Sequence, residues 1–194
     1  IIVSSLFCTL MSGGYLASSG NNRAEFQALI SFSAGAMVLL CQSTNLVSMF
    51  VAIETLSLAV YVLAGFFRQQ KSASEGAFKY FIMGAFSSGF LLLGMALVYG
   101  LSGGSLSLSG IAAADASNDV LFAVGVLLVL IGFAFKVGIV PFHSWVPDVY
   151  QGAPTLAVGW MAVAVKASSF FALCRFLYHT GGGEYLDQIL IALS

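Results

Sequence analysis

Three ionisable residues lie within long apolar stretches of this sequence. Glu54 lies in MFVAIETLSLAVYVLAG, Lys136 in LLVLIGFAFKVGIVPF and Lys166 in LAVGWMAVAVKASSFFAL. A charge at the centre of a bilayer costs about 2.5–3.5 kcal/mol on insertion scales, so such residues usually face a bundle interior or a hydrated cavity and mark ion or proton paths. The alternative is a static buried ion pair that fixes the register of the helices.

These residue types are able to transfer protons. Burial favours the neutral form of a lysine, whereas a nearby carboxylate favours its charged form. A lysine whose distance to a glutamate changes can therefore take up and release a proton, and about 1.4 kcal/mol changes that equilibrium tenfold. Glu54, Lys136 and Lys166 are the side chains that a buried proton relay needs.

The stretch FKVGIVPFHSWVPDVYQGAP, residues 135–154, contains all three prolines of the chain. Pro141 lies in a helical run and has no backbone N–H to donate, which predicts a break just after Lys136. The carbonyls freed by such a break are tolerated beside hydrated cavities. His143 could relay protons through its two nitrogens, although a lone histidine is more often structural. We expect Asp148 to form a local structural contact.

The composition predicts an integral membrane protein. Apolar residues make up 59% of the chain and charged residues only 8%, against about 25% charged residues in soluble domains. The net charge of −1 gives no electrostatic reason to expect nucleic acid as a partner. The three cysteines are far apart and form no CxxC pair, so they indicate neither a metal site nor an iron–sulfur site.

Long apolar runs predict an all-α polytopic bundle that contains a proline-broken helix. Their length and continuity argue against strands. Because the chain begins with Ile1 rather than Met and ends in an apolar run, we expect a fragment of a longer protein, with residues 1–194 as a single membrane domain. The predicted spans are 1–17, 26–42, 46–67, 77–101, 119–150 (broken near Pro141) and 155–178, and another begins at 185.

The basic residues indicate the orientation of the bundle. Arg68, Lys71 and Lys79 cluster at one connection, whereas the linker 102–119 contains two aspartates and no basic residue. The excess of Lys and Arg predicts that the side holding residues 18–25 and 68–79 faces the cytoplasm, or the equivalent matrix or stroma. Arg175 alone falls on the opposite side.

Small residues recur at four-residue spacing in GAFSSG, residues 84–89. Gly84 and Ser88 form one such pair, and Ala85 and Gly89 form another. This spacing lets helices approach closely, and we interpret it as packing rather than chemistry.

The motif FKVGIVPFHSWVPDVYQGAP, followed by a second lysine within the next span, resembles the antiporter-like subunits of respiratory complex I. The form PDVYQGAP is similar to the N-type subunit of bacterial NADH:quinone oxidoreductase. Two upstream stretches, NLVSMFVAIETLSLAVYVLAGF and GAFKYFIMGAFSSGFLLLGMALVYG, are also similar to that subunit. The resemblance covers residues 26–178.

The resemblance implies a fold of two inverted repeats that each contain a broken helix, with this chain holding most of the first repeat. It assigns the family's membrane glutamate to Glu54, the lysine of the broken helix to Lys136, the connecting histidine to His143 and the lysine of the next helix to Lys166. It implies proton translocation coupled to quinone reduction. NAD, FMN, iron–sulfur clusters and quinone are expected on other subunits and no cofactor on this chain. The expected partners are other membrane subunits of complex I, the lipid bilayer and protons, in the bacterial cytoplasmic membrane.

Three alternatives remain open. A subunit of a multisubunit sodium/proton antiporter or of a membrane-bound hydrogenase would share the fold. A solute carrier could use the broken helix to bind its substrate, but the sequence offers no charged substrate clamp. A purely structural membrane subunit would tolerate apolar residues at positions 136 and 166.

Overall fold

The computed structural model describes residues 1–18, 24–114 and 119–180. Across these residues the secondary structure is helical, and the one β-type pairing is an isolated bridge between Asn45 and Ser107. The predicted all-α fold is therefore confirmed. The span predicted to begin at 185 lies outside the described residues.

The described residues form the following helices in chain order: α1 Ile2–Ser18, α2 Ala24–Gln42, α3 Leu46–Ala64, α4 Lys71–Leu101, α5 Leu108–Ala112, α6 Val120–Val137, α7 Trp145–Gly152, α8 Thr155–Trp160, the π-helical turn η1 Met161–Val165, and α9 Lys166–Thr180. The last three run on as one helix, Thr155–Thr180. Within the described ranges, five helices are long and apolar enough to cross a membrane, namely α2, α3, α4, α6 and Thr155–Thr180. The chain is a multi-pass membrane protein.

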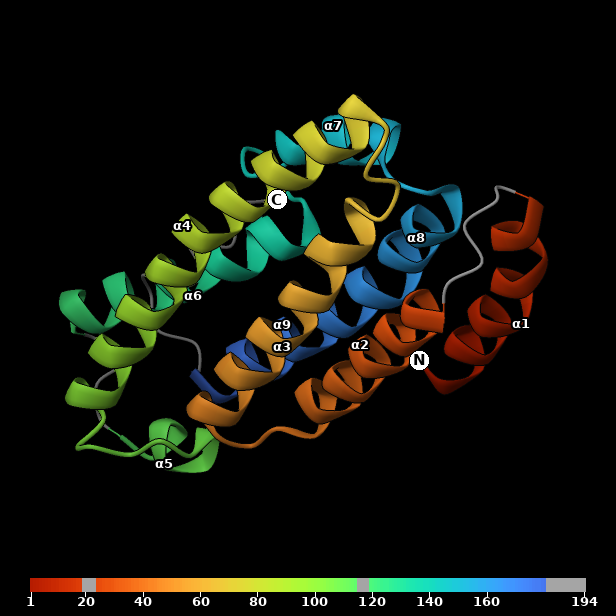
Figure 1. Cartoon of the computed structure of the whole chain (residues 1–194). Coiled ribbons are helices and arrows are strands. Elements are labelled where there is room, and N and C mark those ends of the chain that lie inside the picture. Colours follow the sequence, from red (N-terminus) through yellow and green to blue (C-terminus); the bar gives the residue numbers. More distant parts are fainter. Residues whose placement is uncertain (19–23, 115–118, 181–194) are drawn as a thin grey trace.

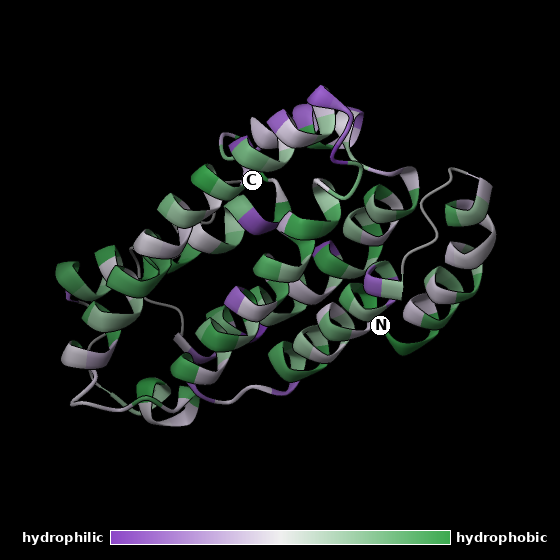
Figure 2. Cartoon of the chain, in the orientation of Figure 1, coloured by the Kyte–Doolittle hydropathy of each residue, from purple (hydrophilic) through white to green (hydrophobic). Residues whose placement is uncertain are grey.

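The helices form a bundle in which α2 and α3 lie side by side, α1 lies on one flank, and α4 with α6 lies on the other (Figure 1). Helix α9 contacts α2, α5 and α6. Figure 2 shows that hydrophobic residues cover most of the helices and that hydrophilic residues gather where α4 begins beside α7. Large apolar side chains such as Phe7, Phe78 and Phe86 are exposed, as expected for surfaces that face lipid.

Helix α4 runs antiparallel to α6 and then to α7, so one continuous helix lies along both halves of the broken one. Glycines make this approach close: a Cβ atom on Gly94 would lie 2.6 Å from the carbonyl oxygen of Gly125, and one on Gly152 would lie 2.5 Å from that of Ser72. Within the GAFSSG stretch, Gly84 faces the ring of Tyr61, whereas Gly89 has no neighbouring atom within 4 Å of its Cβ position.

The break after Lys136 is confirmed. Helix α6 ends at Val137, and Gly138 follows in the left-handed conformation with φ of 80°. The N–H of Ile139 donates to the carbonyl of Ala134 at 2.9 Å, and that of Gly138 donates to the carbonyls of Ala134 and Phe135. This Schellman arrangement satisfies the carbonyls at the helix end. Gly138 therefore ends the helix, and Pro141 lies in the turn that leads to α7.

The prediction that Asp148 forms a local contact is wrong, because its partner is distant in sequence. Asp148 lies inside α7, and its Oδ2 accepts a hydrogen bond from Nζ of Lys79 in α4 at 3.0 Å. Lys79 also contacts Glu75 at 2.8 Å. This exposed ion pair joins the second half-helix to α4.

Arg175 has a structural reason to lie opposite the other basic residues. Its guanidinium Nη1 donates a hydrogen bond to the carbonyl of Cys41, close to the C-terminal end of α2. A cation is favourable there, because the last carbonyls of a helix are unpaired and carry partial negative charge.

Candidate functional site

Lys136 is buried at the centre of the candidate site. It lies in the last turn of α6, and only 3% of its surface is exposed. Its Nζ donates to Oγ of Ser57 in α3 at 2.6 Å. The same nitrogen lies 5.2 Å from the ring centre of Tyr61 and 5.4 Å from that of Tyr80. The ring faces attract a cation by cation–π interaction, so this pocket can hold the charged form of the lysine.

Glu54 lies one helical turn before Ser57, on the same face of α3. Its side chain is half-buried, and Oε1 accepts a hydrogen bond from Oγ of Ser88 in α4 at 2.5 Å. The ion pairs within 4 Å in the described chain all involve Lys79. Glu54 and Lys136 are therefore not in direct contact. Ser57, which contacts Lys136 directly, lies one helical turn from Glu54 along α3.

The contacts of these two serines are not predicted from the sequence. Its patterns indicate a packing role for Ser88 and no role for Ser57. The spacing of Glu54, Ser57 and Tyr61 over two helical turns is a signal that could have identified Ser57. Ser88 belongs to another helix, and no pattern in the sequence pairs it with Glu54.

Lys166 reaches the same helix break from the other side. It lies near the middle of the span Thr155–Thr180, directly after the π-helical turn. Its Nζ lies 5.6 Å from the ring centre of Tyr150 and would be 3.7 Å from a Cβ atom on Gly138. Both lysines therefore adjoin the break. Turns of π-helix occur frequently at functional sites.

Trp145 fills the space between the two half-helices. Its Nε1 donates to the carbonyl of Phe135 at 3.0 Å, which satisfies a carbonyl in the last turn of α6. The indole stacks on Tyr80 with ring centres 4.2 Å apart and meets Tyr150 edge-on at 6.4 Å. One aromatic cluster thus links the tyrosine beside Lys136 to the tyrosine beside Lys166.

His143 and Pro141 are exposed in the turn between α6 and α7. The carbonyl of His143 accepts a hydrogen bond from the N–H of Val146 at 2.9 Å, so its backbone helps to start α7. The contacts of Lys136 and Lys166 given above do not include the imidazole. A relay through His143 stays a prediction.

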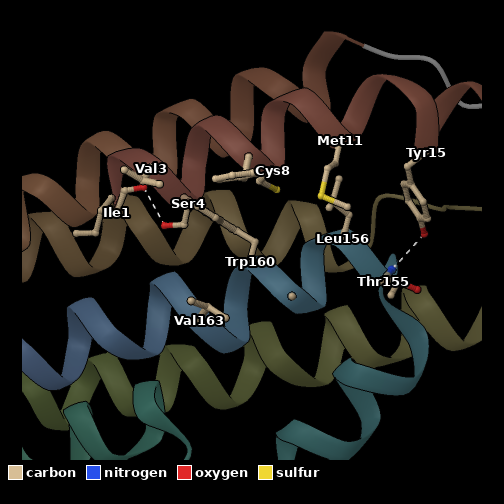
Figure 3. A pocket seen from close by; sticks show the side chains of 12 residues that line it. Ile1, Val3, Ser4, Cys8, Met11, Tyr15, Thr155, Leu156, Trp160 and Val163 are labelled. Atoms are coloured by element: carbon tan, nitrogen blue, oxygen red, sulfur yellow. Dashed lines mark hydrogen bonds between the residues drawn. The ribbon is translucent and has the colours of Figure 1, made fainter.

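Two cavities differ in character. One of about 330 Å³ is lined by Tyr61 together with Glu25, Arg68 and Ser74, and it opens at the polar end of the bundle. The other, of about 700 Å³, is an apolar groove between α1 and the α8–η1 segment (Figure 3). There the N–H of Thr155 donates to the hydroxyl of Tyr15 at 3.1 Å. The first cavity shares Tyr61 with the surroundings of Lys136. The side chains that line the second include no ionisable group other than the weak acids Cys8 and Tyr15.

The described residues contain no group of three or more His, Cys, Asp and Glu placed to hold a metal ion. The groups that contact one another at the site, the Lys136 ammonium with the Ser57 hydroxyl and the Glu54 carboxylate with the Ser88 hydroxyl, are types that can exchange protons.

Known proteins share this sequence and fold. Residues 43–194 match the family described as NADH:quinone oxidoreductase/Mrp antiporter, TM. The chain is 46% identical to NADH-quinone oxidoreductase subunit N of Salinibacter ruber, over 95% of this chain and 38% of that protein. It is 48% identical to the subunit of the same name from Mycobacterium bovis, over 82% of this chain and 30% of that protein. The chain thus spans less than two-fifths of the length of these relatives.

Solved structures agree with this relationship. A chain of respiratory complex I from Thermus thermophilus is 41% identical with a TM-score of 0.73, and the match covers 89% of this chain and 39% of that chain. A chain of the Mrp complex from Dietzia has a TM-score of 0.76 at 22% identity over 89% of this chain and 33% of that chain, which indicates a shared fold. The family match extends over more than half of the sequence and includes Glu54, Lys136 and Lys166. The chain belongs to the NADH:quinone oxidoreductase/Mrp antiporter transmembrane family.

Proposed function

We propose that the chain is part of an N-type subunit of NADH:quinone oxidoreductase and that it moves protons across the membrane. The observation that carries the proposal is the burial of Lys136, held by Ser57 one turn from Glu54 and directly before a helix break. A buried charge that costs free energy to insert is retained where it has a function.

In the proposed mechanism Lys136 is the central proton carrier. Its ammonium form is stabilised by the Ser57 hydroxyl, by the rings of Tyr61 and Tyr80, and by the negative charge of Glu54. Neutralising or displacing Glu54 removes part of that stabilisation, and the desolvated lysine then releases its proton. The Ser57 hydroxyl also donates to the carbonyl of Ile53 at 2.5 Å, so it stays satisfied in either state of the lysine.

Protons reach and leave this carrier at opposite sides. The cavity beside Tyr61 extends to Glu25 and Arg68, where water provides the protons. On the other side of the break, Lys166 accepts the proton and passes it toward the remaining part of the longer protein. The energy comes from quinone reduction on other subunits, to which this chain is coupled by conformational or electrostatic changes.

NAD, FMN, iron–sulfur clusters and quinone belong to other subunits in this proposal, and no cofactor is assigned to this chain. Its partners are the other membrane subunits of the complex, and its location is the bacterial cytoplasmic membrane. Similarity to subunits named NADH-quinone oxidoreductase subunit N supports this assignment.

The Glu54→Gln variant tests the electrostatic part of the mechanism. The amide can still accept the hydrogen bond from Ser88, but the negative charge that favours protonated Lys136 is lost. We expect proton translocation by the intact complex to fall about tenfold, the effect of roughly 1.4 kcal/mol on the proton affinity of the lysine. Proton uptake into inside-out vesicles measures this rate.

Glu75→Gln is the matched control, because Glu75 is exposed near the start of α4 and lies outside the proposed proton path. Its substitution should change the rate by less than twofold, since exposed charges interact weakly through water. A normal rate in Glu54→Gln would contradict a role for this carboxylate.

The His143→Gln variant tests the histidine relay. Because the imidazole is exposed in the turn, we expect a smaller loss of proton translocation than in Glu54→Gln. A loss of 100-fold or more, the size typical of an essential proton-transfer group, would show that protons have to pass through His143. The same vesicle assay applies.

A subunit of a sodium/proton antiporter is the second candidate, because the matching family includes Mrp antiporters. A membrane-bound hydrogenase subunit of this fold would be related in the same way. The neighbouring genes distinguish them: NADH dehydrogenase genes support the first proposal, and antiporter or hydrogenase genes support the second.

A further inference from the structure

Two tyrosine hydroxyls near the lysines are buried without a partner. Tyr80 has no exposed surface, and its hydroxyl oxygen has no hydrogen-bond partner within the described residues. The hydroxyl oxygen of Tyr150 is likewise buried and unpartnered there. Buried polar groups are almost always hydrogen-bonded, to protein or to ordered water, so both hydroxyls need an explanation.

In the folded protein, each of the two tyrosines lies beside one of the two lysines. Nζ of Lys136 lies 5.4 Å from the ring centre of Tyr80, and Nζ of Lys166 lies 5.6 Å from that of Tyr150. Both rings contact Trp145. The ring of Tyr80 also meets the ring of Tyr61 edge-on, with ring centres 4.7 Å apart.

Trp145 itself cannot complete this path. An indole has one N–H and no acceptor nitrogen, and that N–H is already donated to the carbonyl of Phe135. A proton that travels from Lys136 to Lys166 therefore has to pass around the indole. The tyrosine hydroxyls are suited to this, because a hydroxyl accepts one hydrogen bond while it donates another.

We propose that the hydroxyls of Tyr80 and Tyr150 bind water molecules that connect Lys136 to Lys166 around Trp145. This inference rests on the proposed function, since it assigns a route to the same proton. The Lys136 ammonium gives a proton to the first water, each oxygen in the chain passes one proton on, and the neutral amine of Lys166 accepts the last. Both tyrosines return to their neutral form, so no other reactant is needed.

A static aromatic core predicts something different. If the hydroxyls only fill space, phenylalanine at either position removes an unpaired buried polar group and leaves the rings in place. The complex would then be as stable as before or more stable, and its rate would not change. A water chain predicts normal assembly with slower proton translocation.

The experiment compares Tyr80→Phe and Tyr150→Phe in the full-length protein within the intact complex. Tyr99→Phe is the matched control, since Tyr99 is an exposed tyrosine on the same helix as Tyr80 and lies near its other end. The measurements are the amount of complex in the membrane and the proton-translocation rate of inside-out vesicles in H₂O and D₂O. A density map of the wild-type complex, detailed enough to show water, completes the comparison.

We expect each phenylalanine variant to assemble normally and to translocate protons about tenfold more slowly, the effect of one lost hydrogen bond in the path. The D₂O effect should increase, the double variant should resemble the slower single variant because the steps are in series, and Tyr99→Phe should behave as wild type. Water density should lie within hydrogen-bonding distance of both hydroxyls.

Wild-type rates in both phenylalanine variants, together with a slow Lys136→Met variant, would overturn the tyrosine route and leave the proposed function intact. Wild-type rates in all three would instead contradict the proposed function. A lower amount of complex with an unchanged rate per complex would show that the tyrosines are structural, and a map without water at the hydroxyls would also overturn the route.

Discussion

Proton translocation in the Lys136→Met variant is expected to fall at least 100-fold, the range that positioned proton-transfer groups contribute. Methionine fills a similar volume but cannot carry a proton. Its partner Ser57 keeps the hydrogen bond to the carbonyl of Ile53, so the substitution leaves no unsatisfied hydroxyl and the protein should fold. Proton uptake into inside-out vesicles that contain the intact complex, driven by NADH oxidation, provides the measurement.

Lys71→Met is the matched control for this prediction. Lys71 begins α4 and is exposed, so its replacement removes the same charge from the surface instead of from the bundle interior. The control should pump at the wild-type rate. If Lys136→Met pumps normally as well, Lys136 is a structural residue and the proposed mechanism is wrong.

A large loss of stability is expected for Gly94→Ala. A Cβ atom there would lie 2.6 Å from the carbonyl oxygen of Gly125 and 2.7 Å from the backbone nitrogen of Val129. Backbone atoms cannot move aside as a flexible side chain can, so α4 and α6 have to separate along their contact. Overpacking of this kind costs about 1–3 kcal/mol. We expect less complex in the membrane and a lower midpoint of thermal unfolding for the purified complex.

Gly89→Ala, on the same helix, provides the comparison. No atom lies within 4 Å of the Cβ position at Gly89, and alanine favours a helix by about 0.5–1 kcal/mol over glycine. This variant should be as stable as wild type or more stable. Equal destabilisation by the two substitutions would mean that the close contact of α4 with α6 is not what stabilises this region.

The architecture was predictable because the bilayer imposes simple rules on sequence. Long apolar runs gave the helical fold, and the three ionisable residues within them were identified by their cost in lipid. The break after Lys136 followed from the proline nearby. Helix α6 ends because Gly138 adopts a left-handed conformation. The positions of the prolines do not predict that conformation.

The partners of the site residues were not predictable in the same way. Ser57, Tyr80 and Tyr150 are ordinary residue types whose importance depends on which helices pack together. Among the described residues Glu54 and Lys136 form no ion pair within 4 Å, and Ser57 is the residue of α3 that accepts a hydrogen bond from the Lys136 side chain. The face of α3 that is turned toward α6 depends on side-chain packing over the whole bundle. No pattern in a single sequence predicts that face.

The length of α4 has a consequence for the choice of lipid. Its 31 residues span about 46 Å, whereas the hydrocarbon core of a bilayer is about 30 Å thick. The first turns of α4, which carry Lys79 and its ion pair with Asp148, therefore extend to the headgroups, and α7 lies there with them. A membrane with longer acyl chains would bring this ion pair into hydrocarbon and favour an upright α4, whereas a thinner membrane favours tilting of α4. Membrane thickness therefore affects the angle between α6 and α7, which both pack against α4. Through that angle, lipid composition changes the geometry around both lysines.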